Sequence, residues 1–281
     1  MRGVLRIAPE AARPFVKKGK KNDPADAAAL CEAGRRPDIK FVPIKTVEQQ
    51  GVIALHSVRS LLAKQQTMLA NAMRGLATEF GLTVPKGIEK LDDLAALVDA
   101  DKTIPERARQ AFGELHSHCG VVAARIATLE AQIVNHARHD ETARRLATIP
   151  GIGPITASLI SATVGDNIGA FQSARHFAAW LGLVPRQHST GGKTRLGRIT
   201  KAGNKEIRKC LVLGATSMVH RAAQWNSAAG VWVRGVLERR PVRLATVALA
   251  NKMARIAWAL MTRKEVYRAK GRVAAAAEAA A

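Results

Sequence analysis

The chain has 281 residues, and its 44 lysines and arginines against 22 acidic residues give a formal net charge of +22. Hydrophobic residues make up 47% of it, so it can bury a core and is not a disordered basic tail. The positive excess predicts a polyanionic partner, most commonly nucleic acid, because each phosphate contact releases a counterion. We expect no membrane partner, because no uninterrupted apolar run is long enough to span a bilayer.

The cysteines and the first residues indicate a compartment. Cys31, Cys119 and Cys210 are odd in number, far apart and without metal-ligand spacing. The opening Met1–Ile7 is too short for a signal peptide and leads directly into Ala8-Pro9. A reduced, cytoplasmic setting is therefore predicted.

The chain opens with a short β-like run at Gly3–Ile7, and one such strand is not stable by itself. A basic stretch at residues 17–21 follows. Next comes a helix start, with Asp23 as N-cap and Pro24 at the first helical position. We expect this helix to end at Gly34.

Two long helices are predicted in the middle of the chain. The first runs from about Val47 to Phe80, with leucines recurring every seven residues, at Leu55, Leu62, Leu69 and Leu76. A break at residues 81–87 and a short amphipathic helix at 88–98 come next. The second long helix begins near Pro105, and its apolar positions are Ala108, Phe112, Leu115, Cys119, Val122, Ile126, Leu129 and Ile133.

The apolar steps of the second helix alternate between four and three residues, which is the seam of a coiled coil. This spacing fits an antiparallel helical hairpin within one chain and a dimerisation arm equally well, because it specifies packing and not the partner.

The composition changes after Thr142, and five further helices are predicted, at about 155–164, 171–181, 204–223, 230–239 and 242–262. A glycine-rich basic loop spans residues 182–203, and an Ala-rich tail follows Val273. The fold class is mainly α, because Ala, Leu, Val and Ile are plentiful and aromatics few.

The turn at Ile149-Pro150-Gly151-Ile152-Gly153 resembles a helix-hairpin-helix. Gly151 and Gly153 would let the backbone approach a DNA phosphate, where the next helix offers free N–H groups and a positive dipole end. An ordinary tight turn between helices would need glycine too.

The basic loop is the strongest signal in the sequence. Between Asp166 and Glu238 there are eleven lysines and arginines and one acid, Glu206. Signs usually mix on a merely solvated surface, so this imbalance predicts a polyanion-binding loop. It is not a Walker loop, because the full Gly-x-x-x-x-Gly-Lys-Ser/Thr spacing is absent. The predicted nucleic-acid contacts are Arg186, Thr190, Lys193, Arg195, Arg198, Lys201 and Lys205, together with Gly151 and Gly153.

Asp23 and Asp26 lie three residues apart on one helix face and could jointly hold a divalent cation. The alternative is structural, since both would also favour the first turn of a helix. Spacing does not make Ser189 a nucleophile, because serine in a glycine-rich loop is usually a turn residue. Its neighbour His188 could serve as a base only if the two side chains faced each other.

Several motifs together resemble one protein family. Residues 21–27 (Lys-Asn-Asp-Pro-Ala-Asp-Ala) look like the K-x-D-x-x-D-A motif near the end of the RuvC-like domain of DEDD-type transposases. The family's C-terminal transposase domain is matched by four segments, at 149–153, 181–185, 189–193 and 197–204. The family is the insertion-sequence-110 and -1111 type, which includes the pilin-inverting recombinases.

This resemblance implies a magnesium-dependent, four-acid catalytic domain that works with a serine which attacks DNA and forms a phosphoserine link. It implies that Asp23 and Asp26 are the last two acids and metal ligands, and that Ser189 is the nucleophile, with Thr190 as the alternative. It also implies DNA as substrate, a structured guide RNA that selects DNA by base pairing, and a homo-oligomer, a dimer or tetramer.

The resemblance also predicts four segments. Residues 1–40 would be the C-terminal remnant of a RuvC-like α/β domain, 45–141 a helical coiled-coil region, 142–268 the transposase C-terminal DNA-binding domain, and 269–281 an Ala-rich tail. The family's first two acids would precede Gly3, so we expect an N-terminally truncated copy with half a Mg²⁺ site. Such a chain would bind nucleic acid without recombining DNA alone.

Two alternatives to an active transposase remain open. One is a non-catalytic nucleic-acid-binding fragment. The other is a helix-hairpin-helix repair or junction protein, which would need its own catalytic acid or lysine beside the hairpin.

Overall fold

The computed structural model describes residues 6–16, 22–39, 41–193, 195–225 and 227–268. The chain divides into two compact units, Met1–Glu48 and Gln49–Ala281. The predicted basic stretch at 17–21 and the Ala-rich tail lie outside the described residues. The finer domain bounds drawn from the sequence stay predictions.

The first unit holds a small two-stranded sheet. Strand β1 (Arg6–Ile7) pairs antiparallel with β2 (Phe41–Val42), which the sequence did not indicate. The other elements of this unit are α1 (Pro9–Ala12), η1 (Arg13–Phe15) and α2 (Asp23–Arg35). The predicted opening strand therefore has a partner.

Both predicted ends of α2 were wrong by one or two residues. The N-cap is Asn22 and not Asp23: Asn22 has extended backbone, and its side chain accepts a hydrogen bond from the Ala25 N–H at 2.9 Å. The helix continues through Gly34 to Arg35, because a single glycine is tolerated within a helical turn.

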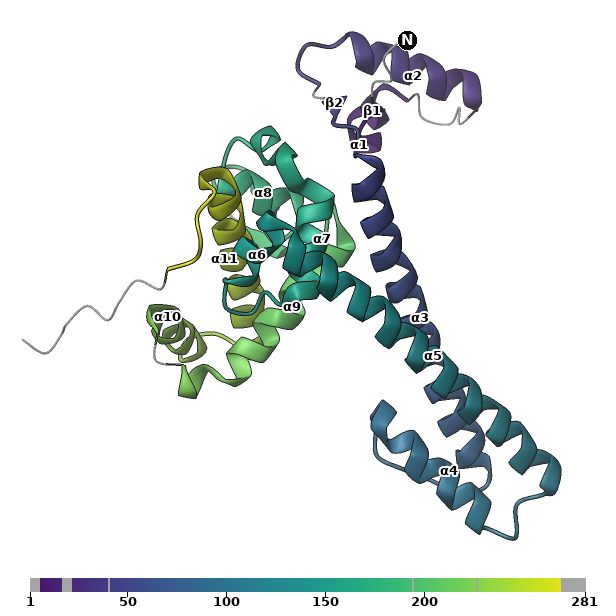
Figure 1. Ribbon diagram of the computed structural model, residues 1–281. Helices are drawn as coiled ribbons and strands as arrows, with labels where there is room; N and C mark the ends of the chain where they lie inside the picture. The colour runs from purple at the N-terminus through teal and green to yellow at the C-terminus, as the bar shows by residue number, and fades with distance from the viewer. Residues whose placement is uncertain (1–5, 17–21, 40, 194, 226, 269–281) are drawn as a thin grey trace, which may run out of the picture. The chain divides into compact units, whose positions relative to one another are not determined.

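The long helix α3 (Val47–Glu79) leads into a second unit built of helices (Figure 1). The elements that follow α3 are η2 (Ile88–Lys90), α4 (Leu91–Ala100), α5 (Glu106–His139), α6 (Glu141–Ala147), α7 (Pro154–Val164), η3 (Gly165–Ala170), α8 (Ala174–Trp180), α9 (Lys205–His220), η4 (Ala222–Gln224), α10 (Ala228–Leu237) and α11 (Val242–Arg263). The predicted mainly helical fold is confirmed. None of the described helices is both long and apolar enough to cross a bilayer.

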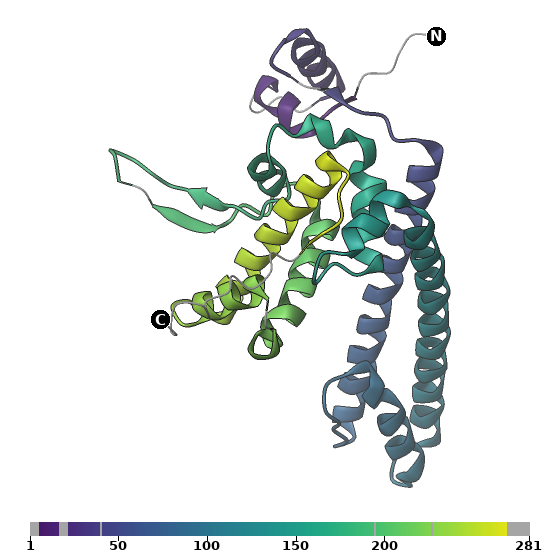
Figure 2. The same ribbon diagram turned by 60° about the vertical axis from the view of Figure 1, so that its left-hand side comes forward.

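Helices α3 and α5 lie side by side in both views, with α4 packed at one end (Figures 1 and 2). One core joins the three helices and includes Met73, Leu94 and Phe112. Arg59 of α3 pairs with Glu130 of α5, with its Nε 2.8 Å from Oε1. We call α3, α4 and α5 the helical arm.

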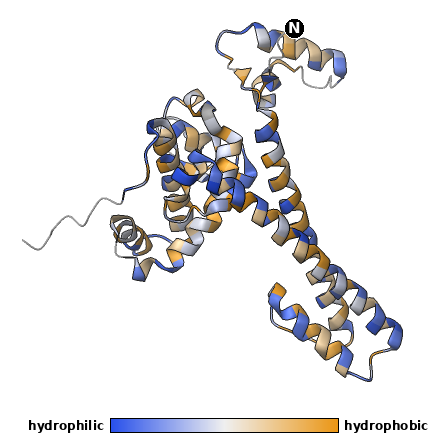
Figure 3. Ribbon diagram, in the orientation of Figure 1, coloured by the Kyte–Doolittle hydropathy of each residue, from blue (hydrophilic) through white to orange (hydrophobic). Residues whose placement is uncertain are grey.

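Of the two apolar seams predicted for the arm, the one on α5 is confirmed and the one on α3 is wrong. The α5 seam is the buried one, at Phe112, Cys119, Val122 and Ile133. On α3 the heptad of leucines is not the buried face: Leu76 is 44% exposed, and the buried positions are Val52, His56, Ala70, Met73 and Ala77. The leucines therefore lie beside the buried stripe of α3 and not at its centre. Hydrophobic and hydrophilic residues accordingly alternate around both helices (Figure 3).

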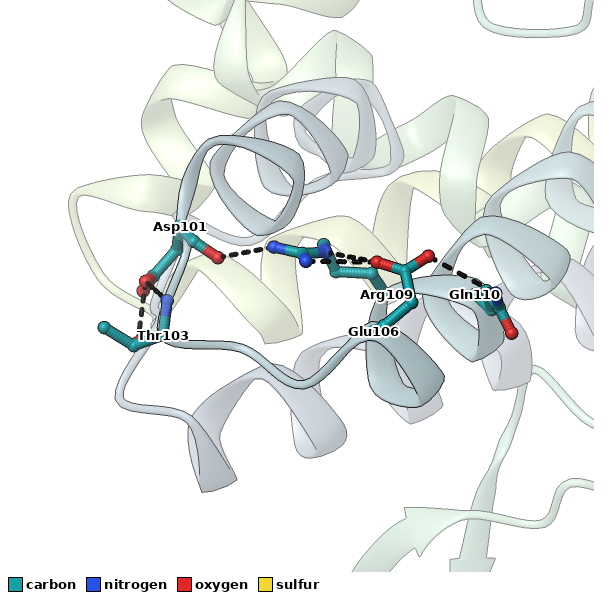
Figure 4. Close-up of polar contacts among 5 residues, drawn as sticks. All are labelled: Asp101, Thr103, Glu106, Arg109 and Gln110. Atoms are coloured by element: carbon teal, nitrogen blue, oxygen red, sulfur yellow. Dashed lines mark hydrogen bonds and ion pairs between the residues drawn. The ribbon is translucent and has the colours of Figure 1, made fainter.

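A polar cluster fixes the turn between α4 and α5 (Figure 4). The Asp101 carboxylate accepts hydrogen bonds from the Thr103 N–H at 2.8 Å and hydroxyl at 2.7 Å, which lower its pKa. Arg109 donates to the Asp101 carbonyl at 3.2 Å and pairs with Glu106 at 3.0 Å. Gln110 adds a contact to Glu106. The turn that reverses the arm is thus held by side chains as well as by packing.

The remaining helices pack around α11, whose neighbours include α6, α8, α9 and α10. Their core contains Leu146, Ile160, Phe177, Leu211 and Met253, all nearly or fully buried. We call this assembly of α6 to α11 the C-terminal body.

The segment predicted as an irregular loop contains a β-hairpin instead. Strands β3 (Pro185–Gln187) and β4 (Leu196–Ile199) pair antiparallel, with Pro185 opposite Ile199. A further bridge joins Thr190 and Lys193 near the tip. Figure 2 shows this hairpin projecting from the helices. We call residues 182–203 the basic hairpin.

Candidate nucleic-acid interface

Two glycines allow close backbone contacts at the root of the basic hairpin, one across the root and one with the end of α8. A Cβ on Gly203 (φ 66°) would lie 1.8 Å from the Trp180 carbonyl oxygen. One on Gly182 (φ 68°) would lie 2.4 Å from the Ala202 nitrogen. Only glycine allows these approaches, so this pair shapes the root rather than contacting a ligand.

The tip of the basic hairpin is different. Gly191 and Gly192 also have positive φ, of 58° and 79°, but a Cβ on either would meet no atom within 4 Å. The backbone of Gly191 and Gly192 is therefore open to an approaching molecule.

The predicted cations lie on the surface of the basic hairpin and at the start of α9. The exposed positions are Arg186, Lys193, Arg195, Arg198, Lys201 and Lys205. No ion pair in the described part of the chain involves any of the six. The one acid of the interval, Glu206, accepts a hydrogen bond from Ser60 of α3 at 3.1 Å. No acid in the described part of the chain therefore neutralises these six charges.

Two cations from the sequence count serve the fold instead. Arg208 donates from one guanidinium nitrogen to the carbonyls of Leu181 (2.9 Å) and Ala202 (2.6 Å), which fastens the hairpin root to α9. Arg234 donates to the carbonyls of Ala222 (2.7 Å) and Trp225 (2.9 Å). Charge counting cannot separate such residues from phosphate contacts.

Ser189 is exposed on the basic hairpin, and its Oγ accepts a hydrogen bond from the Arg195 N–H at 3.2 Å. Thr190 beside it is also exposed. The His188 ring lies over Gly197, where an added Cβ would be 3.2 Å from His188 Cδ2. Ser189 is thus accessible, and it stands next to a backbone N–H that favours negative charge on its oxygen.

The predicted helix-hairpin-helix turn connects α6 to α7. Gly151 (φ 86°) packs within the C-terminal body: an added Cβ would lie 2.9 Å from Met253 Cε and 3.2 Å from the Gly214 carbonyl oxygen. Gly153 is the exposed N-cap of α7 and has no atom within 4 Å of its would-be Cβ. Of the two glycines, Gly153 has the room that a phosphate requires.

Asp23 and Asp26 lie in the first turn of α2, Asp23 exposed and Asp26 half-buried. Neither forms an ion pair with another described residue. No group of three or more His, Cys, Asp or Glu with metal-binding placement occurs over the described residues. The pair belongs to the first unit, and Ser189 to the second.

The structure adds cations that the sequence did not single out. A groove of about 1280 Å³ runs between the basic hairpin and α11. Its cationic lining residues are Arg198, Lys201, Arg243, Lys252 and Arg255, and none of its described lining residues is acidic. The three from α11 were missed because they alternate with core residues along an ordinary amphipathic helix. Only their position opposite the basic hairpin distinguishes them.

Comparison with known proteins places this surface in a family. Residues 143–229, which hold the α6–α7 turn and the basic hairpin, match the model of the transposase IS116/IS110/IS902 family. A protein of Sinorhizobium fredii named as a transposase is 47% identical over 266 residues, covering 94% of this chain and 68% of the relative.

Two further relatives agree. The transposase for insertion sequence element IS1328 of Yersinia enterocolitica is 42% identical over 264 residues, 94% of this chain and 78% of the relative. A pilin gene-inverting protein of Moraxella lacunata is 42% identical over 71 residues, 25% of this chain and 22% of the relative. The chain belongs to the IS116/IS110/IS902 family of transposases.

Proposed function

We propose that this protein binds the DNA of an insertion sequence through the basic hairpin and joins a broken strand covalently to Ser189. The observation that carries the proposal is the set of six exposed cations, five on the basic hairpin and one at the start of α9, without acidic partners among the described residues; the hairpin also presents an accessible serine. Such a surface contacts phosphates and is largely independent of base sequence.

The covalent step uses groups on one hairpin. The Ser189 oxygen attacks a phosphorus atom of the DNA backbone, a serine–phosphate ester forms, and the bond to the leaving strand oxygen breaks. The serine proton passes to water, and the leaving oxygen takes a proton from water. The Arg195 N–H, already 3.2 Å from Oγ, favours the charged oxygen, and the neighbouring cations offset charge on the phosphate. Thr190 is the alternative nucleophile.

A divalent cation, Mg²⁺, is part of the proposal. Asp23 and Asp26 offer two carboxylates on one helix face, which suits a hard cation that takes its other ligands from water, phosphate or further acids. When bound, Mg²⁺ would neutralise charge on the scissile phosphate. The two aspartates' own role is to hold it from the first turn of α2. We interpret the β1–β2 pair with α2 as a piece of a RuvC-like domain.

The remaining partners are proposals of the same kind. A structured guide RNA would supply the sequence selection that a phosphate-contacting surface lacks, and the arm would serve assembly into a dimer or tetramer. The α6–α7 turn acts as a helix-hairpin-helix, with Gly153 and the start of α7 facing a phosphate.

The test compares Ser189→Ala with Thr190→Ala in the full chain, with DNA, guide RNA and Mg²⁺. DNA binding is followed by gel shift, and the covalent protein–DNA product on a denaturing gel. Product from the wild-type chain would overturn the expectation that it does not recombine DNA alone; Ser189→Ala should then abolish that product while binding stays, and Thr190→Ala should retain both. Loss in Thr190→Ala alone would move the nucleophile by one residue. Wild-type binding without product would favour the non-catalytic alternative.

A further inference from the structure

The groove between the basic hairpin and α11 differs from the rest of the cationic surface because its floor is apolar. Leu183, Leu244, Val247 and Ile256 line it, together with Trp232 of α10. Leu244 is 50% exposed, although leucine is usually buried. Apolar side chains do not bind phosphate, so a surface that bound only phosphates would not need them.

The cations stand around this floor. Lys252 Nζ lies 4.3 Å from the centre of the Trp232 ring, which fixes the ammonium at the wall of the groove. Burial lowers the pKa of Lys252, and the nearby charge of Arg255 lowers it further. No acid is among the described lining residues, so no acid of the groove offsets the charges of Lys252, Arg255 and Arg243.

We propose that this groove binds a single-stranded segment of nucleic acid, with unpaired bases against the apolar floor and phosphates on the surrounding cations. A duplex hides the faces of its bases and would leave the floor without a partner, whereas an unpaired strand offers apolar faces and phosphates together. The volume of about 1280 Å³ exceeds what one small ligand fills. The inference rests on the proposed nucleic-acid function and assigns a strand type to one part of the surface.

The test uses two matched variants in the first turn of α11. Leu244→Asp places a carboxylate on the groove floor. Val242→Asp makes the same charge change on the same turn, at a residue that is also 50% exposed but does not line the groove. A carboxylate in a first helical turn favours the helix, so both variants should fold. Lys252→Met removes one charge and keeps a flexible side chain against Trp232.

Binding is measured by fluorescence anisotropy with single-stranded DNA, single-stranded RNA of the same sequence and duplex DNA. We expect Leu244→Asp and Lys252→Met to weaken single-strand binding about tenfold more than duplex binding. Val242→Asp should weaken both equally and less. The single strand, DNA or RNA, that loses more affinity is the one that the groove prefers. Equal losses would support a groove that binds unpaired DNA and unpaired RNA alike.

Three outcomes overturn the groove proposal: Leu244→Asp behaves like Val242→Asp, single-strand and duplex binding fall together, or an acidic peptide competes as well as the single strand. A separate variant, Lys193→Ala with Arg195→Ala, reports on the basic hairpin. If duplex binding depends on the hairpin while Leu244→Asp matches its control, only the groove proposal fails. If wild-type protein binds no nucleic acid, the proposed function fails as well.

Discussion

Ser158 of α7 is fully buried between two histidines where the arm meets the C-terminal body. Its Oγ lies 3.0 Å from His56 Nε2 of α3 and 3.0 Å from His136 Nδ1 of α5. A hydroxyl donates one hydrogen bond, so one ring nitrogen accepts from Ser158 and the other donates to it. The site is structural, because a DNA strand cannot reach a hydroxyl that has no exposed surface.

This buried contact makes stability depend on pH. Burial, with repulsion from Arg59 and then His136, lowers the pKa of His56 from 6.5 to about 4. Between these values the unfolded chain binds a proton at His56 that the folded chain does not. The free energy of unfolding should therefore fall as the pH is lowered from 6.5 to 4, by about 1 kcal/mol per pH unit.

Urea unfolding across this pH range, for wild type and His56→Gln, measures the effect. Glutamine can still bond Ser158 but does not titrate, so the stability gap between the two proteins should narrow as the pH falls. Parallel stability curves would mean that His56 titrates normally in the folded protein.

At the scale of elements, the close approach of α9 to the α6–α7 turn depends on glycine. A Cβ on Gly214 would lie 1.9 Å from the Gly151 carbonyl oxygen. On the arm, Gly120 of α5 is exposed, with no atom within 4 Å of its would-be Cβ. A side chain at Gly214 would therefore clash with its neighbours, whereas one at Gly120 would not.

We expect Gly214→Ala to lower the free energy of unfolding by about 2 kcal/mol, because the steric clash outweighs the gain in helix propensity. Gly120→Ala should raise it by about 0.5–1 kcal/mol through propensity alone. Thermal melting of the two variants checks both signs. A stabilising Gly214→Ala would show that the turn can move away from α9.

Local signals in the sequence were enough to locate most helices. Pro105 before α5, Asn204 before α9 and Pro241 before α11 mark their starts, and the α5 seam is buried as its spacing predicts. The leucine repeat of α3 misled, because its buried face is set by three-dimensional packing against α4 and α7 and not by the largest apolar residues.

The candidate site was only partly predictable. The cations of the basic hairpin follow from charge counting, but its strands do not, since short polar runs between glycines lack the alternation that indicates a strand. The structural roles of Gly182 and Gly203 required knowing that Gly182 meets Ala202 and that Gly203 meets Trp180, residues about 20 positions apart in sequence. The same holds for the groove, which needs α11 opposite the hairpin.

At the scale of the whole molecule, the net charge of +22 makes DNA binding dependent on salt. Association releases counterions from the DNA, so the affinity should fall as the salt concentration rises. The exposed hairpin cations should account for part of this dependence. Replacing Lys193 and Arg195 by alanine should reduce the slope of log affinity against log salt by about 2, one unit for each phosphate contact.

Filter-binding titrations over a salt series give the slope. Arg208→Ala would confuse the result by loosening the hairpin root, so Lys264→Ala, an exposed cation just after α11, is the better control and should leave the slope unchanged. An unaltered slope in the Lys193 and Arg195 double variant would place the phosphate contacts elsewhere.

The clamped root and open tip of the basic hairpin have a consequence for its reach. The space around Gly191 and Gly192 is open, whereas an insertion beside Gly182 or Gly203 would disrupt the close contacts of these glycines with Ala202 and Trp180. Chain length can therefore vary at one end without loss of anchorage at the other. Residues could therefore be added at the tip of the basic hairpin one at a time. The same C-terminal body could then carry hairpins of different length.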